Sequence, residues 1–163
     1  MLVVVGLGGN LGDPPTAFSA ALRELDRRHP VVALSSLYRS PAEGPSQPDY
    51  LNAAAVVDAD LSPRRMLAVL HRLEAAAGRD RGREVRWGPR PLDLDLLLAE
   101  HLVCRGPRLT LPHPRLDRRA FALAPAAEVA PSWVHPLRGV TLLDLVLAAG
   151  ATLEPHPWPE ERG

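Results

Sequence analysis

Two aspartates lie two residues apart inside an apolar run near the middle of the chain. Asp93 and Asp95 alternate with leucines from Leu92 to Leu96, and in a strand such a pair points to one face with Cα atoms about 6.5 to 7 Å apart. Two like charges held side by side at the edge of a core repel each other and lose hydration. A divalent cation that prefers oxygen ligands offsets that cost. The spacing therefore predicts a magnesium site at Asp93 and Asp95.

Arginines precede and follow this acid pair at short intervals. All 19 basic residues are arginine and none is lysine, and ten of them lie between Arg79 and Arg119. Arginine keeps its charge and binds phosphate through two parallel hydrogen bonds. Arginines beside magnesium are what phosphoryl or pyrophosphoryl transfer requires, because catalysis there consists mainly of positioning and charge stabilisation. A solvated loop is the alternative interpretation of such a run.

The composition excludes several classes of nucleotide-binding protein. A P-loop nucleotidase and a protein kinase each need a lysine on the phosphates, and this chain has no lysine. The glycine cluster from Gly6 to Gly12 has Leu11 where a dinucleotide fingerprint needs glycine, so we interpret it as a tight turn. The net charge of zero gives no global attraction to nucleic acid or to an anionic membrane.

The length and apolar content indicate one domain. A chain of 163 residues that is 46% hydrophobic suits a single domain over residues 1–163 with a full-sized core. The N-terminal apolar run is too short for a signal peptide, and no run reaches the length of a membrane span. We therefore expect a cytoplasmic protein that acts as a monomer. The single cysteine, Cys104, excludes an internal disulfide and a cysteine-based zinc cluster.

Hydrophobic periodicity and turn residues predict the elements that position these side chains. Strands are expected at residues 1–9, 31–38 and 50–57 and over the acid pair. Helices are expected at 14–29, 62–77, 118–128 and 142–149. The order βαββαβ predicts an α+β fold with a ferredoxin-like core, a mostly antiparallel sheet and helices on both of its faces. The proline-rich tail from residue 154 is expected to fray.

Several short motifs accompany the acid pair in the order known from one enzyme family. They are Gly8-Gly9-Asn10-Leu11-Gly12, Tyr38-Arg39-Ser40-Pro41, Gln47-Pro48-Asp49-Tyr50-Leu51-Asn52-Ala53, Arg86-Trp87-Gly88-Pro89-Arg90 and Leu109-Thr110-Leu111-Pro112-His113-Pro114. Through these motifs and Leu92-Asp93-Leu94-Asp95, residues 1 to 136 resemble the 6-hydroxymethyl-7,8-dihydropterin pyrophosphokinases of folate biosynthesis.

The resemblance implies a reaction and a set of site residues. Pyrophosphate would pass from ATP to the hydroxymethyl group of the reduced pterin, giving AMP and the pterin diphosphate, with two magnesium ions held by Asp93 and Asp95. Arg79 and Arg90 would assist the transition state, and Asp95 would also help to deprotonate the attacking hydroxyl. The implied ATP contacts are Glu74, Arg81, Arg86, Trp87, Arg108, Thr110, His113 and Arg119. The implied pterin contacts are Ser40, Pro41, Glu43, Tyr50, Asn52 and Phe121.

Three other functions compete with this one. A catalytically silent pterin- or nucleotide-binding module of the same fold has no physical need to retain a repulsive acid pair. A generic magnesium-dependent nucleotidyl or phosphohydrolase enzyme explains the acid pair and the arginines but not Tyr50, Asn52 and Trp87. An RNA-binding ferredoxin-like domain displays aromatic residues on its open sheet face, whereas acids in that place repel phosphate. We therefore expect small-molecule partners, ATP and a reduced pterin, and no nucleic acid or membrane.

Overall fold

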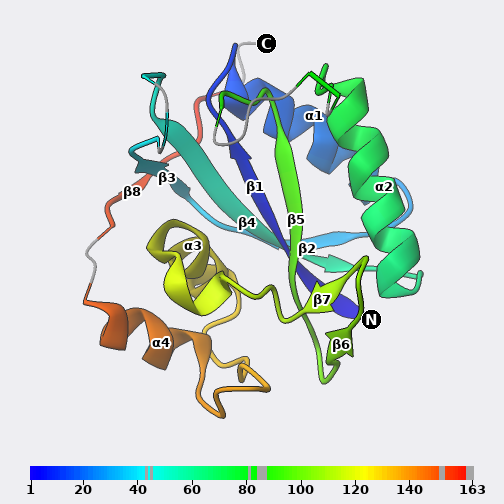
Figure 1. Ribbon diagram of the computed structural model, residues 1–163, viewed down its shortest axis with the longest axis vertical. Coiled ribbons are helices and arrows are strands. Elements are labelled where there is room, and N and C mark those ends of the chain that lie inside the picture. Colours follow the sequence, from blue (N-terminus) through cyan, green and yellow to red (C-terminus); the bar gives the residue numbers. More distant parts are fainter. Residues whose placement is uncertain (43, 45, 81, 84–87, 151–152, 161–163) are drawn as a thin grey trace.

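An antiparallel sheet of six strands forms the centre of the molecule (Figure 1). In this computed structural model, which describes residues 1–42, 44, 46–80, 82–83, 88–150 and 153–160, the strand order is β5-β1-β4-β3-β8, and β2 also pairs with β4. All of these pairings are antiparallel. The strands are β1 (Leu2–Gly9), β2 (Val31–Leu34), β3 (Leu37–Ser40), β4 (Tyr50–Asp58), β5 (Asp93–Ala99) and β8 (Pro155–His156).

Helices cover both faces of the sheet, as predicted. Helices α1 (Pro14–Asp26) and α2 (Pro63–Ala76) pack on one face, and α3 (Ala120–Val129) and α4 (Leu142–Ala149) lie on the other (Figure 1). A small second sheet of β6 (Cys104–Arg105) and β7 (Thr110–Leu111) adjoins β5. None of the helices in the described part of the chain is long and apolar enough to span a membrane.

Strand alternation divides the apolar residues between two cores. In β1, Val3, Val5 and Leu7 belong to the core under α1 and α2, whereas Val4 belongs to the core under α3 and α4. Successive side chains of a strand point to opposite faces, so Gly6 and Gly8 share the face of Val4. That face therefore loses its own side chains toward the end of β1, where Leu97 packs over Gly6 and Gly8 borders a cavity.

The two helices of the first face begin as their sequences predict. The side chain of Asp13 accepts the backbone N–H of Thr16 at the start of α1, and that of Ser62 accepts the N–H of Arg65 at the start of α2. Each cap satisfies a backbone donor that has no partner within the helix. Helix α1 ends at Asp26 rather than at residue 29, because the Asp26 carboxylate accepts the N–H of Val31 at 2.9 Å and starts β2.

The prediction of one strand over residues 31–38 is wrong, because the chain forms two short strands separated by Ser35 and Ser36. The Ser35 hydroxyl accepts the N–H of Ala54 at 2.8 Å. The Glu128 carboxylate, on α3, accepts the N–H of Ser36 at 3.0 Å and its hydroxyl at 2.8 Å. These side-chain bonds take backbone groups away from the strand ladder and break the strand. Helix α3 also starts later than predicted, after a short 3-10 helix at Leu116–Arg118.

The prediction of a frayed tail from residue 154 is wrong for residues 155–158. Strand β8 pairs with β3, joining Leu37 to His156 and Tyr38 to Pro155. The Trp158 indole N–H donates to the Ser35 carbonyl at 2.7 Å, and its ring meets that of Phe18 edge-on at 6.1 Å between centroids. A single tryptophan therefore anchors the tail on the core, a contact that local periodicity does not reveal.

We expect Trp158→Ala to lower the free energy of unfolding by about 2 kcal/mol, since it removes a half-buried aromatic side chain and a hydrogen bond. Urea unfolding followed by fluorescence or circular dichroism measures this change. Glu160→Ala, at an exposed position two residues further on, is the matched control and should leave stability unchanged. Equal stability of both variants and the parent chain would show that the tail is not docked.

Candidate active site

A cavity of about 550 Å³ lies on the α3 face of the sheet, where the glycines leave room. Its walls come from β1, β3, β4 and β5, from the segment after β7 and from the start of α3. The structure thereby brings together most of the residues that the sequence singled out. These are Ser40, Pro41, Tyr50, Asn52, Arg79, Arg90, Asp93, Asp95, His113, Arg119 and Phe121.

Glycines form the floor of the cavity between the acid pair and Asn52. The strand register places Gly8 between Asp93 on β5 and Asn52 on β4, and Gly6 opposite Asp95. Facing residues on neighbouring antiparallel strands point to the same side of the sheet. A Cβ atom at Gly8 would lie 3.6 Å from the Asn52 side-chain oxygen and 4.0 Å from the Asp93 Cβ. A side chain there would fill the floor and separate the acids from Asn52.

Two arginines hold the Asp93 carboxylate. Nη1 of Arg79 donates to Oδ1 at 2.8 Å, and Nη1 of Arg90 donates to Oδ2 at 3.4 Å. The Arg79 guanidinium also pairs with the buried carboxylate of Glu74. Both arginines that the sequence marked as catalytic candidates therefore lie directly on the first acid of the pair.

Asp95 is electrostatically unfavourable in its charged form. Burial, together with the nearby carboxylates of Asp93 and Glu74, raises the pKa of its carboxyl to about 7, while Arg119 and Arg79 oppose the rise. A divalent cation held by these acids would remove this penalty, because it would favour the charged form of both.

The acid pair fits magnesium better than it fits a metal held by protein ligands alone. Within the residues that the structure describes, no group of three or more His, Cys, Asp or Glu side chains is placed to hold a metal. Magnesium is commonly bound by one or two carboxylates, with substrate phosphates and water completing its shell. Two carboxylates beside an open, arginine-lined cavity are a donor set of that kind.

Aromatic and amide side chains line the β3–β4 side of the cavity. The Tyr50 hydroxyl donates to the Gly88 carbonyl at 2.9 Å, and this bond links the Tyr50 ring to the segment before β5. The Asn52 amide donates to the Ser40 hydroxyl at 2.9 Å and to the Tyr38 carbonyl at 3.3 Å. Phe121 contributes a second ring from the first turn of α3. Such a set suits a flat heteroaromatic ligand with a polar edge.

His113 and Arg119 also line the cavity, from the segment between β7 and α3. Burial and the charge of Arg119 lower the pKa of His113, so its ring is neutral at pH 7. Nδ1 of His113 accepts the N–H of Arg115 at 3.2 Å, which assigns the ring proton to Nε2. The Arg119 guanidinium stands 5.7 Å from the centre of the Phe121 ring. Both side chains can donate to phosphate oxygens.

Some predicted site residues lie elsewhere. Glu74 is buried behind the cavity wall and does not line it, and Arg108 and Thr110 are exposed on the β6–β7 hairpin, outside the cavity. Glu43, Arg81, Arg86 and Trp87 fall outside the described residues.

Sequence reasoning missed Asn10 and Arg115. Asn10 is buried; its Oδ1 accepts the N–H of Arg90 at 2.9 Å, and its Nδ2 donates to Gln47 at 2.8 Å and to the Pro48 carbonyl at 2.9 Å. It therefore joins the loop before β4 to the segment before β5. Arg115 lines the cavity, but nothing in the sequence separated it from the other arginines.

Comparisons with known proteins show the family of this chain. The family model described as 7,8-dihydro-6-hydroxymethylpterin-pyrophosphokinase (HPPK) matches residues 4–131. The chain belongs to this family. The 2-amino-4-hydroxy-6-hydroxymethyldihydropteridine pyrophosphokinase of Synechocystis sp. is 41% identical over 98% of this chain and 80% of its own length. The enzyme of the same name from Haemophilus influenzae is 42% identical over 81% of this chain and 83% of its own length. The resemblance found in the sequence is thereby confirmed.

Longer proteins carry the same fold. The mitochondrial folate synthesis bifunctional protein of Pisum sativum is 39% identical over 78% of this chain, which matches 25% of that protein. Wild-type HPPK-DHPS from Plasmodium falciparum superposes with a TM-score of 0.67 at 12% identity, over 91% of this chain and 44% of that one. At such low identity the superposition establishes the fold alone, and the α+β class with its antiparallel sheet is confirmed.

We expect the stability of the metal-free protein to fall as pH rises from about 4 to about 7, relative to Asp95→Asn. The unfolded carboxyl loses its proton near its ordinary pKa of 3.8, whereas the folded one keeps it up to about 7. Over that window the native state binds more protons, so stability falls by at most about 1.4 kcal/mol per pH unit. Above pH 7 the difference is constant.

Urea unfolding of both proteins in a metal chelator, from pH 4 to pH 8, measures the difference. Because all other groups titrate in both proteins, only the difference between them reports on Asp95. A difference that does not change with pH would contradict a raised pKa at Asp95.

Proposed function

We propose that the chain transfers the terminal pyrophosphate of ATP to the hydroxymethyl group of 6-hydroxymethyl-7,8-dihydropterin, giving AMP and the pterin diphosphate in folate biosynthesis. One observation carries this proposal. A single row across the sheet, Asp93–Gly8–Asn52, joins an acid pair flanked by arginines to an amide in the cavity that the rings of Tyr50 and Phe121 also line. The first end suits phosphates and the second suits a pterin, and the bare glycine lets the two substrates meet.

The pterin is proposed to lie between the rings of Tyr50 and Phe121. Flat heteroaromatic rings stack well on aromatic faces, and the Asn52 amide can both donate to and accept from an aminopyrimidinone edge. Ser40 holds that amide through its hydroxyl. Pro41 also lines the cavity, in line with its proposed pterin contact. The pterin contact of Glu43 stays a prediction.

The triphosphate is proposed to lie against Arg79, Arg90, His113 and Arg119, which all line the cavity. The hydroxyl oxygen of the pterin attacks the β-phosphorus, and the bond from that phosphorus to the oxygen bridging the α- and β-phosphates breaks. The proton passes to a carboxylate oxygen of Asp95, and AMP leaves with the bridging oxygen. Arginines positioned before the reaction stabilise the charge that develops on the phosphate oxygens. Contacts of Arg81, Arg86, Trp87, Arg108 and Thr110 with ATP stay predictions.

Asp93 and Asp95 are proposed to hold two magnesium ions. When bound, magnesium neutralises phosphate charge and fixes the attacking and leaving oxygens in line. The raised pKa of Asp95 supports this assignment, since burial and then the carboxylates of Asp93 and Glu74 disfavour its charged form, which a bound cation would stabilise. Monomeric state and cytoplasmic location stay predictions.

We expect a mixture of the protein, ATP, magnesium and the hydroxymethyl dihydropterin to yield AMP and the pterin diphosphate in equal amounts. Product analysis by chromatography measures both. Asp95→Asn, which keeps the size of the side chain but not its charge, should form neither product. The appearance of ADP would indicate ordinary phosphoryl transfer, and binding of both substrates without turnover would indicate a catalytically silent module.

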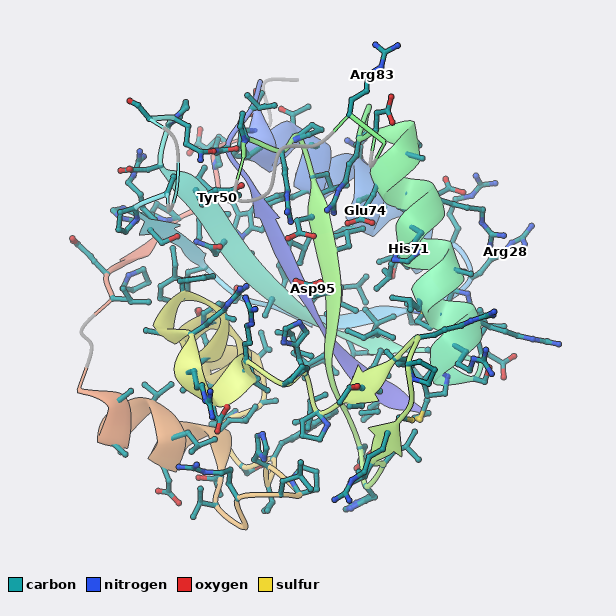
Figure 2. The ribbon with its side chains drawn as sticks, viewed as in Figure 1. Arg28, Tyr50, His71, Glu74, Arg83 and Asp95 are labelled. Atoms are coloured by element: carbon teal, nitrogen blue, oxygen red, sulfur yellow. The ribbon has the colours of Figure 1, made fainter. Side chains whose placement is uncertain are left out.

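We expect Arg90→Ala to slow the chemical step by roughly 100-fold or more, in line with the loss of one preorganised charge donor. Pterin affinity should change much less, because Arg90 lies at the acid end of the cavity on Asp93. Single-turnover kinetics and equilibrium binding separate the two effects. Arg83→Ala is the control, since Arg83 points away from the protein (Figure 2) and its side chain is 90% exposed. An unchanged single-turnover rate in Arg90→Ala would exclude the proposed role.

A further inference from the structure

Glu74 is a buried carboxylate on the apolar stripe of a helix. The buried residues of α2 are Met66, Leu70 and Glu74, spaced four apart so that they share one face. Glu74 closes this stripe with a charge where packing alone favours an apolar side chain, and it is only 1% exposed. A charge buried so deeply lowers the stability of the fold unless it is paired. Its partners therefore indicate its purpose.

The first partner of Glu74 is the backbone between the two acids. Strand β5 is the edge of the sheet, and Glu74 lies between α2 and this strand (Figure 2). Its Oε2 accepts the N–H of Leu94 at 3.0 Å. Leu94 separates Asp93 from Asp95, so the carboxylate satisfies an edge-strand donor at the centre of the acid pair.

The second partner is Arg79. The chain turns back just after α2 ends and brings Arg79 next to Glu74. Gly78 has a φ of +94°, a conformation that glycine adopts at helix ends, and the N–H of Arg79 donates to the Glu74 carbonyl at 3.1 Å. The Arg79 side chain is 3% exposed, and it bridges Glu74 to Asp93. Charges thus alternate from Glu74 through Arg79 to Asp93.

We propose that Glu74 is a positioning residue that acts through Arg79 and does not contact ATP. This inference rests on the proposed function of the cavity. The Glu74 carboxylate holds the Arg79 guanidinium beside the acid pair, so that Arg79 stays available to phosphate oxygens when other cations compete for Asp93. Without the Glu74 carboxylate, the Arg79 guanidinium would rest on Asp93. There it would compete with any cation bound to Asp93.

The placement of Glu74 argues against the direct nucleotide contact implied by the family resemblance. Its side chain does not line the cavity, and the oxygen that binds Leu94 and Arg79 faces the protein interior. A carboxylate also repels phosphate. The shared partner, Arg79, lines the cavity in its place.

Glu74→Gln tests the proposal, because the amide keeps the size of the side chain and can still accept the Leu94 N–H. We expect kcat to fall roughly tenfold or more, as expected when a catalytic group is misplaced. The Kd of an unreactive α,β-methylene analogue of ATP with magnesium should change less than about twofold, because uniform binding is retained. A raised Kd with unchanged kcat would show a direct nucleotide contact and overturn the proposal.

A double-mutant cycle with Arg79→Met identifies the path of the effect. If Glu74 acts through Arg79, the double variant has the kcat of Arg79→Met alone. If the fold-losses of kcat in the two single variants multiply in the double variant, the proposal is overturned. Leu70→Ala, one turn earlier on the same stripe, controls for lost packing: it should lower stability and leave kcat unchanged. An equal loss of kcat in Leu70→Ala would make the role of Glu74 merely structural.

NMR of the free protein tests the positioning of Arg79 without any reaction. We expect a slowly exchanging Arg79 Nε–H signal, assigned by its absence in Arg79→Met, that Glu74→Gln broadens or removes. A signal unaffected by Glu74→Gln overturns the proposal whatever the activity. A wild-type protein that keeps this behaviour but forms no AMP would contradict the proposed function and still confirm that Glu74 positions Arg79.

Discussion

The repulsion between two carboxylates at the edge of a sheet is the constraint on which the rest of the site depends. Asp93 and Asp95 share one face of β5, and burial, together with the charge of Asp93, raises the pKa of Asp95 to about 7. The surrounding residues offset this repulsion. Arg79 and Arg90 bind Asp93, and Arg119 acts on Asp95, whereas Glu74 adds negative charge while it anchors the intervening backbone. The site is thus built to accept positive charge and phosphate together.

Open space is the second requirement, and it comes from the alternation of one strand. The same β1 that packs Val3, Val5 and Leu7 against α1 and α2 presents Gly6 and Gly8 on its other face. Segments outside the strands line the rest of the space, and Asn10 joins two loops through partly buried hydrogen bonds. A floor built on paired strands favours preorganisation, because the strand ladder fixes the residues on it before substrates bind.

Most regular elements could be predicted from local patterns. The apolar stripe of α1, the caps Asp13 and Ser62 and the alternation of β5 are each encoded within a few residues. The failures had non-local causes. Glu128, far along the chain, breaks the predicted strand at Ser36, and Trp158 anchors the tail by reaching Ser35 and Phe18. Long-range hydrogen bonds of this kind leave no periodic signal.

The amino-acid sequence by itself determined the chemistry of the site: the acid pair, arginine as the only cationic partner, and the motifs that carry Tyr50 and Asn52. Spacing and residue type suffice for this, because they set charge and strand face. Only the tertiary structure decided which residues meet. It placed Glu74 behind Arg79, left Arg108 outside the cavity and made Asn10 a link between loops. Those outcomes depend on where distant segments pack, which the local pattern of a chain does not specify.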